Sequence, residues 1–334
     1  MKCARLLAFT VLAFMLSQTS ADAQSARGSL PSTPPAPKTA APDDALLEIK
    51  NDLQSGMRYR LEITDTQQRL RDGVAEYSVT IVTEADLVVT EAVGGVAVVE
   101  LVFGTPSVRN SDDSLEARLA ITSYRIFEGK RILYRTNGSG AVTGLANSHE
   151  IGKVFNDVVD RLIRDVGRET NIPMIVESVR AGLDPMRRGP YMESLALELP
   201  KLFHFFSGLK LDSRTNYSRS KFMRLRLNGA EVAGTLDYDL AWFDRTKQVA
   251  WLRWSQTADR VRTADVVEAY MRDIAGKAGH RLPIRLDMGS VGASEGAVYE
   301  LDLKTGLPKT IAFARHYEML GFSSRQSLNI RVIQ

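Results

Sequence analysis

Positions 57–70 alternate between apolar and polar side chains with a period of two. One face carries the apolar side chains of Met57, Tyr59, Leu61 and Ile63. This alternation predicts a half-buried β-strand. Further strand patterns follow up to Leu145, including 118–127 and 131–135 on either side of a predicted Glu128-Gly129-Lys130 turn. The first half of the chain therefore predicts an antiparallel meander of five or six strands.

Apolar residues at three- and four-residue spacing then predict helices. The strongest pattern runs from Ile151 to Val166, with Asn147 and Glu150 resembling a capping box before it. Shorter helices are predicted at 173–182 and 191–199. The apolar segment 200–211 is predicted as a loop. A last helix is predicted around Val266 to Ile274, with Thr263 as its N-cap.

Strand patterns return on both sides of that last helix. They cover 232–243, 248–254, 297–303, 307–317 and 323–333, and Asn228-Gly229 is a hairpin dipeptide. Strands rarely alternate singly with helices, so a parallel doubly wound sheet is not expected. The order predicts an α+β fold: one large curved, half-barrel-like antiparallel sheet packed against two or three amphipathic helices.

The N-terminal residues differ in composition from the rest of the chain. Residues 1–23 combine two basic residues, an apolar core from Leu6 to Leu16 and an Ala21-Asp22-Ala23 motif. This is the pattern of a signal peptide cleaved after Ala23, and it predicts a periplasmic or secreted protein. The alternative, an uncleaved anchor, fits the short apolar core less well. No later apolar run of about 18 residues predicts a transmembrane span.

Residues 24–45 are rich in proline and alanine and predict a disordered linker. The folded domain is then expected to cover 46–334. Both 46–170 and 200–334 follow a meander-plus-helix order, so one domain and two similar halves remain open.

Composition removes several classes of function. Among 334 residues, 43 basic and 40 acidic side chains leave a formal charge of +3, too balanced for a protein that coats nucleic acid. The single cysteine, Cys3, belongs to the predicted signal peptide, so no disulfide framework is expected. Four scattered histidines predict no metal site, and no cofactor motif is present.

Bulky aromatic residues are the candidate ligand-binding groups. They are Phe203, Phe205, Phe206, Trp242 and Trp251. Such residues most often fill a core, and the alternative is that some line an apolar cleft on the concave side of the sheet. The sequence leaves core and cleft open. A basic stretch from Arg214 to Arg226 fits either a charged strand face or a surface that meets anionic lipid or polysaccharide.

One motif points to catalysis. Gly292-Ala293-Ser294-Glu295-Gly296 matches the G-x-S-x-G sequence of serine hydrolases, with Asp302 and His316 following in hydrolase order. That chemistry needs a strand, a sharp turn and a helix, whereas a strand pattern follows here. A turn between two strands therefore explains the motif better than a catalytic Ser294, and no catalytic residue is assigned.

Two short segments carry a resemblance. The strand at Gly56-Met57-Arg58-Tyr59-Arg60-Leu61, and the run from Gly296 to Pro308 with its Asp302-x-x-Thr305-Gly306 turn, resemble an uncharacterised family of bacterial exported envelope proteins. The architecture also resembles the half-barrels of periplasmic lipoprotein carriers. This resemblance implies no catalytic residue.

These observations predict a non-catalytic exported protein that binds an apolar or lipid-like ligand. The alternative is an interaction or assembly factor that binds another envelope protein; a serine hydrolase using Ser294 is the third and weakest interpretation.

Overall fold

The computed structural model describes residues 46–71, 74–112, 114–170, 172–187, 189–225, 229–279, 291–319 and 321–333. The predicted signal peptide and linker lie outside these ranges. The strands are β1 (Leu46–Glu48), β2 (Arg58–Arg71), β3 (Val74–Val93), β4 (Val96–Phe103), β5 (Ser107–Ser111), β6 (Arg131–Thr136), β7 (Val142–Leu145), β8 (Lys210–Asp212), β9 (Asn216–Arg224), β10 (Glu231–Asp244), β11 (Val249–Ala258), β12 (Gly292–Asp302), β13 (Pro308–Met319) and β14 (Phe322–Val332).

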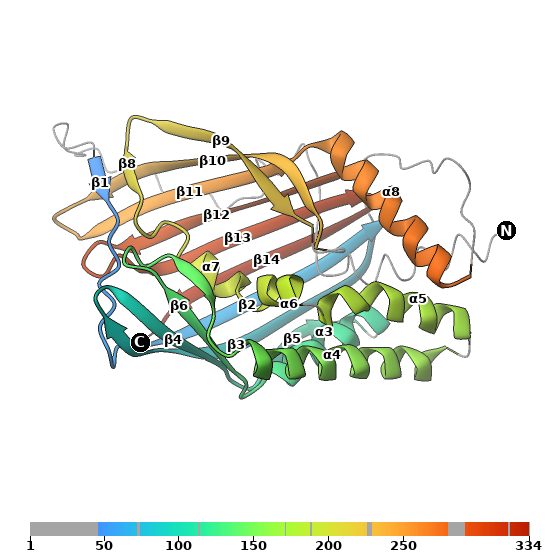
Figure 1. Ribbon diagram of the computed structural model, residues 1–334. Helices are drawn as coiled ribbons and strands as arrows, with labels where there is room; N and C mark the ends of the chain where they lie inside the picture. Colours follow the sequence, from blue (N-terminus) through green and yellow to red (C-terminus); the bar gives the residue numbers. More distant parts are fainter. Residues whose placement is uncertain are drawn as a thin grey trace.

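One antiparallel sheet dominates the molecule (Figure 1). Twelve strands form it, in the order β7-β6-β4-β3-β2-β14-β13-β12-β11-β10-β9, with β5 paired to β3. Strands β1 and β8 form a separate two-stranded sheet. Because β2 pairs with β14, strands from 46–170 and from 200–334 share the large sheet. The division of the domain into two similar halves stays a prediction.

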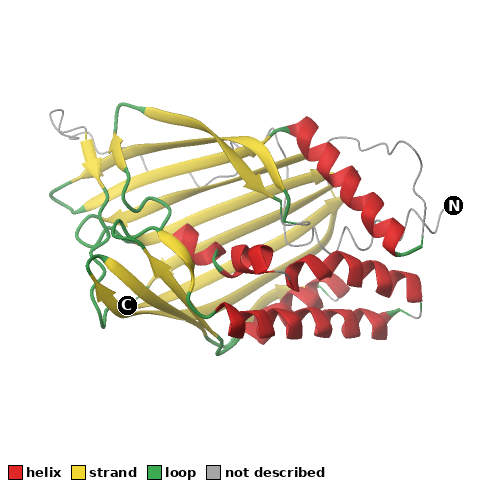
Figure 2. Cartoon of the chain, in the orientation of Figure 1, coloured by secondary structure: helices red, strands yellow, loops and turns green. Residues whose placement is uncertain are grey.

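The helices gather in front of one face of this sheet (Figure 2). They are α3 (Leu115–Phe127), α4 (Ser148–Glu169), α5 (Pro173–Leu183), α6 (Gly189–Ala196), α7 (Glu198–Phe203) and α8 (Arg260–Lys277), with a 3₁₀ turn at Asp184–Arg187. The predicted α+β class, a large antiparallel sheet packed against helices, is confirmed. The described residues contain more helices than the two or three expected.

The prediction of a strand at 118–127 is wrong, because this segment belongs to helix α3. Ser114 caps the helix, accepting a hydrogen bond from the backbone N–H of Ala117 at 3.2 Å. The buried residues Ala117, Leu119 and Ala120 then pack inward. Leu119 and Ile121 are apolar residues two positions apart and also fit a period of two, so periodicity alone could not separate the two structures.

Three helix boundaries also differ from expectation. Asp259, not Thr263, caps α8, because its side chain accepts from the N–H of Arg262. Asn147 precedes α4 without a side-chain cap bond; its side chain instead bonds the backbone of β6 at Leu133 and Arg131. The loop predicted at 200–211 begins as the last turns of α7.

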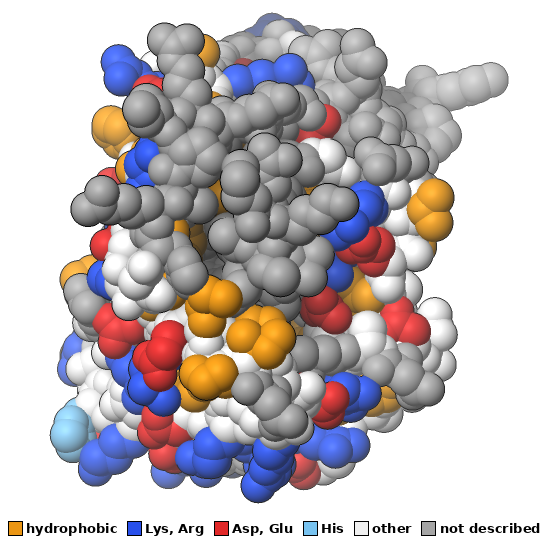
Figure 3. Space-filling view, turned by 90° about the vertical axis from the view of Figure 1, so that its right-hand side faces the viewer, with side chains coloured by type: hydrophobic (Ala, Val, Ile, Leu, Met, Phe, Trp, Pro, Cys, Tyr) orange, Lys and Arg blue, Asp and Glu red, His pale blue; other side chains and the backbone are white. Residues whose placement is uncertain are grey.

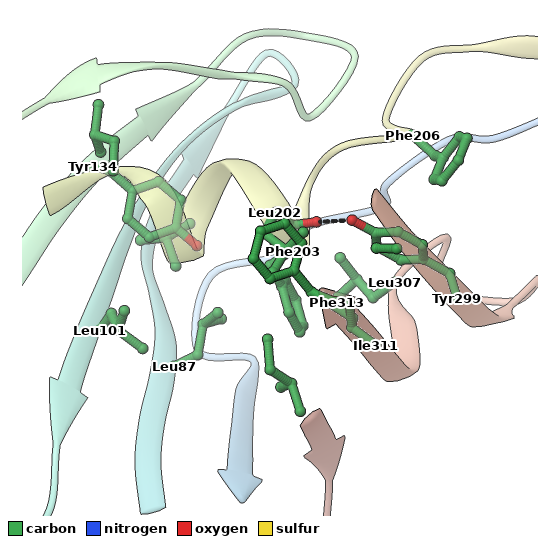
Figure 4. Close-up of a cluster of buried hydrophobic side chains, with 14 of the residues drawn as sticks. Leu87, Leu101, Tyr134, Leu202, Phe203, Phe206, Tyr299, Leu307, Ile311 and Phe313 are labelled. Atoms are coloured by element: carbon green, nitrogen blue, oxygen red, sulfur yellow. Dashed lines mark hydrogen bonds between the residues drawn. The ribbon is translucent and has the colours of Figure 1, made fainter. Parts of the chain in front are cut away.

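The main core lies between the sheet and the α6–α7 segment (Figure 4). Leu202 and Phe203 of α7 point toward Tyr299, Ile311 and Phe313 of the sheet. The Tyr299 hydroxyl donates to the carbonyl of Leu202 at 2.9 Å, and this bond joins the helical layer to β12. Burial raises the pKa of the Tyr299 hydroxyl, which keeps it a donor.

The Asp302-x-x-Thr305-Gly306 motif forms the turn between β12 and β13. The N–H of Gly306 donates to the carbonyl of Asp302 at 2.8 Å, and Gly306 has φ of +70°. A side chain at Gly306 would collide with the carbonyl oxygen of Lys50. Glycine is therefore required here both by its backbone conformation and by the close approach of another segment.

Candidate functional site: an internal cavity above the sheet

A cavity of about 520 Å³ lies between the sheet and the helical layer. Its floor comes from strands β2, β14, β13, β12, β11 and β9, and its roof comes from α3, α4, α6 and α7. Ligand-binding cavities in proteins typically measure about 300–1,000 Å³. The floor spans six strand-to-strand steps of the sheet, about 29 Å at the usual spacing between strands, so the cavity is elongated.

Apolar side chains make up most of the wall. The floor strands β2, β14, β13 and β11 contribute Ile63, Leu328, Phe313 and Trp254, of which Leu328 and Phe313 are direct cross-strand neighbours. Phe205 stacks on Trp254 with ring centroids 4.6 Å apart, and from the helical layer Phe127 and Phe155 meet edge to face. These apolar parts of the wall can therefore accept hydrocarbon.

A row of polar side chains crosses this floor. Its members are direct cross-strand neighbours in the sheet: Gln67, Gln326, Arg315, Glu295 and Gln256. All five line the cavity. Since a buried polar group is costly unless it is hydrogen-bonded, the row marks the place where the wall can discriminate between ligands.

Arg315 is the charged centre of the row. It donates to Glu295 at 2.7 Å and contacts Glu198 of α7 at 2.5 Å, although its side chain is only 8% exposed. Burial has the largest single effect and acts to lower the pKa of Arg315, but the charge and hydrogen bond of Glu295, together with nearby Tyr317 and Tyr191, outweigh it, so the pKa is raised overall. The guanidinium therefore stays charged and ties the sheet to the helical layer.

A second hydrogen-bonded group in the cavity wall is centred on Asp65 and includes Gln326. Asp65 accepts from Tyr124 at 2.7 Å, from Gln67 at 2.6 Å and from Gln326 at 3.0 Å. The Oε1 atom of Gln326 has no hydrogen-bond partner among the described residues, and the side chain is 93% buried. A ligand donor could meet this oxygen.

Cationic side chains stand at the rim. Lys201 of α7, Lys221 of β9 and Arg224 of β9 are exposed and also line the cavity. Arg224 pairs with Glu231 at 2.5 Å. Partial burial lowers the pKa of both lysines; the charge of Arg224 adds to the lowering at Lys201, and the charges of Arg219 and then Lys201 add to it at Lys221.

The structure distributes the sequence-predicted aromatic residues over three environments. Phe205 lines the cavity. Phe203 and Phe206 are 3% and 2% exposed and belong to the core. Trp242 and Trp251 pair across β10 and β11, with ring centroids 6.2 Å apart, on the face opposite to Leu252. The structure therefore brings only Phe205 of this set to the cavity.

The polar lining residues escaped the sequence analysis. Their signal was nevertheless present: Asp65, Gln67 and Arg69 continue the inward-facing series of Leu61 and Ile63. A polar residue where alternation demands an apolar one marks a site on the inner face.

The serine-hydrolase geometry is not formed. Ser294 lies inside strand β12 rather than on a turn, which also corrects the turn predicted at 292–296. His316 sits opposite Ser294 on β13, but Asp302 ends the same strand as Ser294, about 26 Å further along at 3.3 Å per residue. Gly296 is needed because a side chain there would lie 2.7 Å from the carbonyl oxygen of Trp254.

His204 has a structural environment. Its ring nitrogens lie 3.0 Å from the Tyr134 hydroxyl and 3.1 Å from the Asn51 amide. Complete burial lowers the pKa of His204 to about 4, so the ring is neutral at pH 7. Within the described ranges, no group of three or more histidine, cysteine or acidic residues could hold a metal ion.

No protein-family model matches the chain, and no curated protein matches it. One solved structure that matches is titled "Lipid-protein interactions in lipovitellin". The similarity has a TM-score of 0.36 at 9% identity, and it covers 85% of this chain and 26% of lipovitellin. The chain thus spans about a quarter of that protein. At this level the similarity carries no argument about function.

A second hollow of about 440 Å³ lies between α3 and α4. Its wall alternates in charge: Arg125, Lys130, Arg161 and Arg164 face Glu128, Asp157 and Asp160. Lys and Arg side chains also gather along the lower edge of Figure 3, on the side where α4 lies in Figure 1. This hollow lacks an apolar wall and is a weaker ligand candidate. None of the helices in the described ranges has the length and apolar content needed to cross a membrane.

Proposed function

We propose that this protein binds an apolar, lipid-like ligand in the cavity above the sheet. The observation that carries the proposal is the elongated hollow of about 520 Å³, walled mainly by apolar side chains. Its volume lies within the usual range for ligand sites, and it combines an apolar wall with polar groups along one row of the floor and at the rim. Transfer of hydrocarbon from water into such a wall is favourable at about 25 cal/mol per Å² buried.

The proposal includes export and the absence of catalysis. A signal peptide at 1–23 would deliver the chain to the periplasm or the exterior. There, a binding protein could carry or hold a poorly soluble ligand of the cell envelope. The lack of a hydrolase elbow at Ser294 is in keeping with a binding role.

The first experiment purifies the protein from cells without detergent and identifies co-purifying molecules by mass spectrometry. The delipidated protein is then titrated with a neutral apolar dye, N-phenyl-1-naphthylamine. A bound lipid or saturable dye fluorescence is expected. Absence of both would refute the proposal.

A blocking variant connects binding to the cavity. Ser194 of α6 lines the hollow, so Ser194→Trp should place an indole in the ligand space and lower dye affinity at least tenfold. Ser55 lies in an exposed turn outside the cavity, and Ser55→Trp is the matched control. Equal affinities for the two variants would place the ligand elsewhere.

A second candidate function is protein–protein interaction at the edge of the sheet. Strand β9 ends the strand order and pairs only with β10, and its Phe222 is 65% exposed. Edge strands can add a strand from a partner. Cross-linking in cells from a photoreactive residue at position 222, followed by mass spectrometry, tests this candidate; an absence of cross-linked protein would remove it.

A further inference from the structure

We infer that the cavity takes an anionic amphiphile, with its acid group held between Lys201 and Lys221 at the rim and its hydrocarbon chain inside. The inference rests on the proposed function and narrows it to a chemical class. Its basis is the charge arrangement around the cavity.

Most charged groups that line the cavity are satisfied within the protein. Arg315 is paired with Glu295 and Glu198, and Arg224 is paired with Glu231. Asp65 accepts three hydrogen bonds. The charged lining groups left over are therefore the two lysines.

Among the described residues, neither lysine forms an ion pair, and the acids whose charge acts on them are engaged elsewhere. Glu295 acts on Lys221 but is held by Arg315. Glu193 acts on Lys201 but accepts from the backbone N–H of Leu145 at 3.0 Å. The rim thus presents two ammonium groups that line the same cavity and lie in a locally positive surrounding, with Arg224 acting on Lys201 and with Arg219 and Lys201 acting on Lys221. An anion between the two lysines would relieve that repulsion.

The rim leads directly into the apolar wall. The Lys221 ammonium lies 5.5 Å from the centre of the Phe205 ring, and Phe205 stacks on Trp254. A cation at the rim followed by an aromatic wall further inside suits a molecule with an acid head and an apolar tail. The other end of the floor, at Gln67 of β2, is six strand-to-strand steps from β9, so the chain can extend away from its head group.

A carboxylate and a phosphate share this chemistry, and three ligands with one chain length distinguish them. Palmitate, hexadecyl phosphate and hexadecanol are titrated into the delipidated protein, produced from the full chain, by displacement of N-phenyl-1-naphthylamine. At least one acid is expected to bind ten or more times as tightly as the alcohol at pH 7. The tighter acid identifies the head group.

The variant Lys201→Gln/Lys221→Gln should lose that preference while keeping its affinity for hexadecanol. Lys210→Gln/Lys304→Gln, which changes two exposed lysines outside the cavity, should retain it. Equal binding of acids and alcohol by the unmodified protein, or a preference that survives in the rim variant, would overturn the inference and leave the proposed function standing. If neither the dye nor any of the three ligands binds, both the inference and the proposed function are overturned.

Discussion

Replacement of Arg315 by methionine removes a buried cation that serves two acids, Glu295 and Glu198, beneath the helical layer. The Arg315 side chain is 8% exposed, Glu295 is 17% exposed and Glu198 is 30% exposed. Removing one partner of a buried ion pair costs about 3–5 kcal/mol, because a charge is left without compensation. Since water reaches Glu198, the expected loss in free energy of unfolding is near the lower end, about 3 kcal/mol.

The sheet supplies a matched control. Arg331 and Glu62 are also direct cross-strand neighbours that form an ion pair, at 3.0 Å, but their side chains are 62% and 31% exposed. Exposed pairs contribute about 0–1 kcal/mol, so Arg331→Met should change stability little. Both variants lose the same charge and gain the same side chain.

Urea unfolding followed by circular dichroism measures the difference. With a urea slope of about 3 kcal/mol per M, a loss of about 3 kcal/mol moves the midpoint down by about 1 M. A third variant, Arg315→Met with Glu198→Gln and Glu295→Gln, should recover much of that loss because no unpaired carboxylate remains. The reasoning fails if Arg315→Met and Arg331→Met have the same midpoint, or if the third variant is no more stable than Arg315→Met.

Three further predictions concern other parts of the chain. The buried neutral His204 has a pKa of about 4, against 6.5 for a free histidine. The stabilisation of the folded protein by the neutral ring is therefore complete above pH 6.5 and is lost as the pH falls toward 4. The loss amounts to about 3 kcal/mol, and His204→Gln should flatten this part of the stability–pH curve measured by urea unfolding. Gly306→Ala should cost at least about 2 kcal/mol in thermal unfolding, whereas Gly56→Ala, which also has positive φ but open space around it, should cost less; equal losses would contradict the steric argument. Intact-mass analysis of the exported protein should find Gln24 as the first residue, and a chain that keeps Met1 would contradict the predicted cleavage.

The elements predicted best are those whose local pattern of apolar residues fits only one type of secondary structure. The period of two at 57–70 became β2, and the three- and four-residue spacing at 151–166 became α4. The strand prediction for 118–127 was wrong because the apolar residues of this segment fit the period of a strand as well as that of a helix, and packing against β3 selected the helix. Tertiary contacts override weak local preferences in this way.

The candidate site was less accessible to sequence reasoning. Aromatic residues were proposed as ligand contacts, and only Phe205 reaches the cavity. The polar row could not be assembled, because Gln67 and Gln326 become neighbours only through the pairing of the first long strand with the last. Lys201 and Lys221 are likewise brought to one rim from a helix and an edge strand.

By itself, the sequence determined the α+β class, the antiparallel strand patterns and the apolar face of α4, because these depend on side-chain periodicity within one segment. Tertiary structure alone decided the strand register, the cavity and the placement of the two rim lysines. Register couples residues more than two hundred positions apart, as in the pairing of Asp65 with Leu328, and no local pattern encodes which partner a strand will meet. The candidate binding site exists only where those long-range pairings bring its residues together.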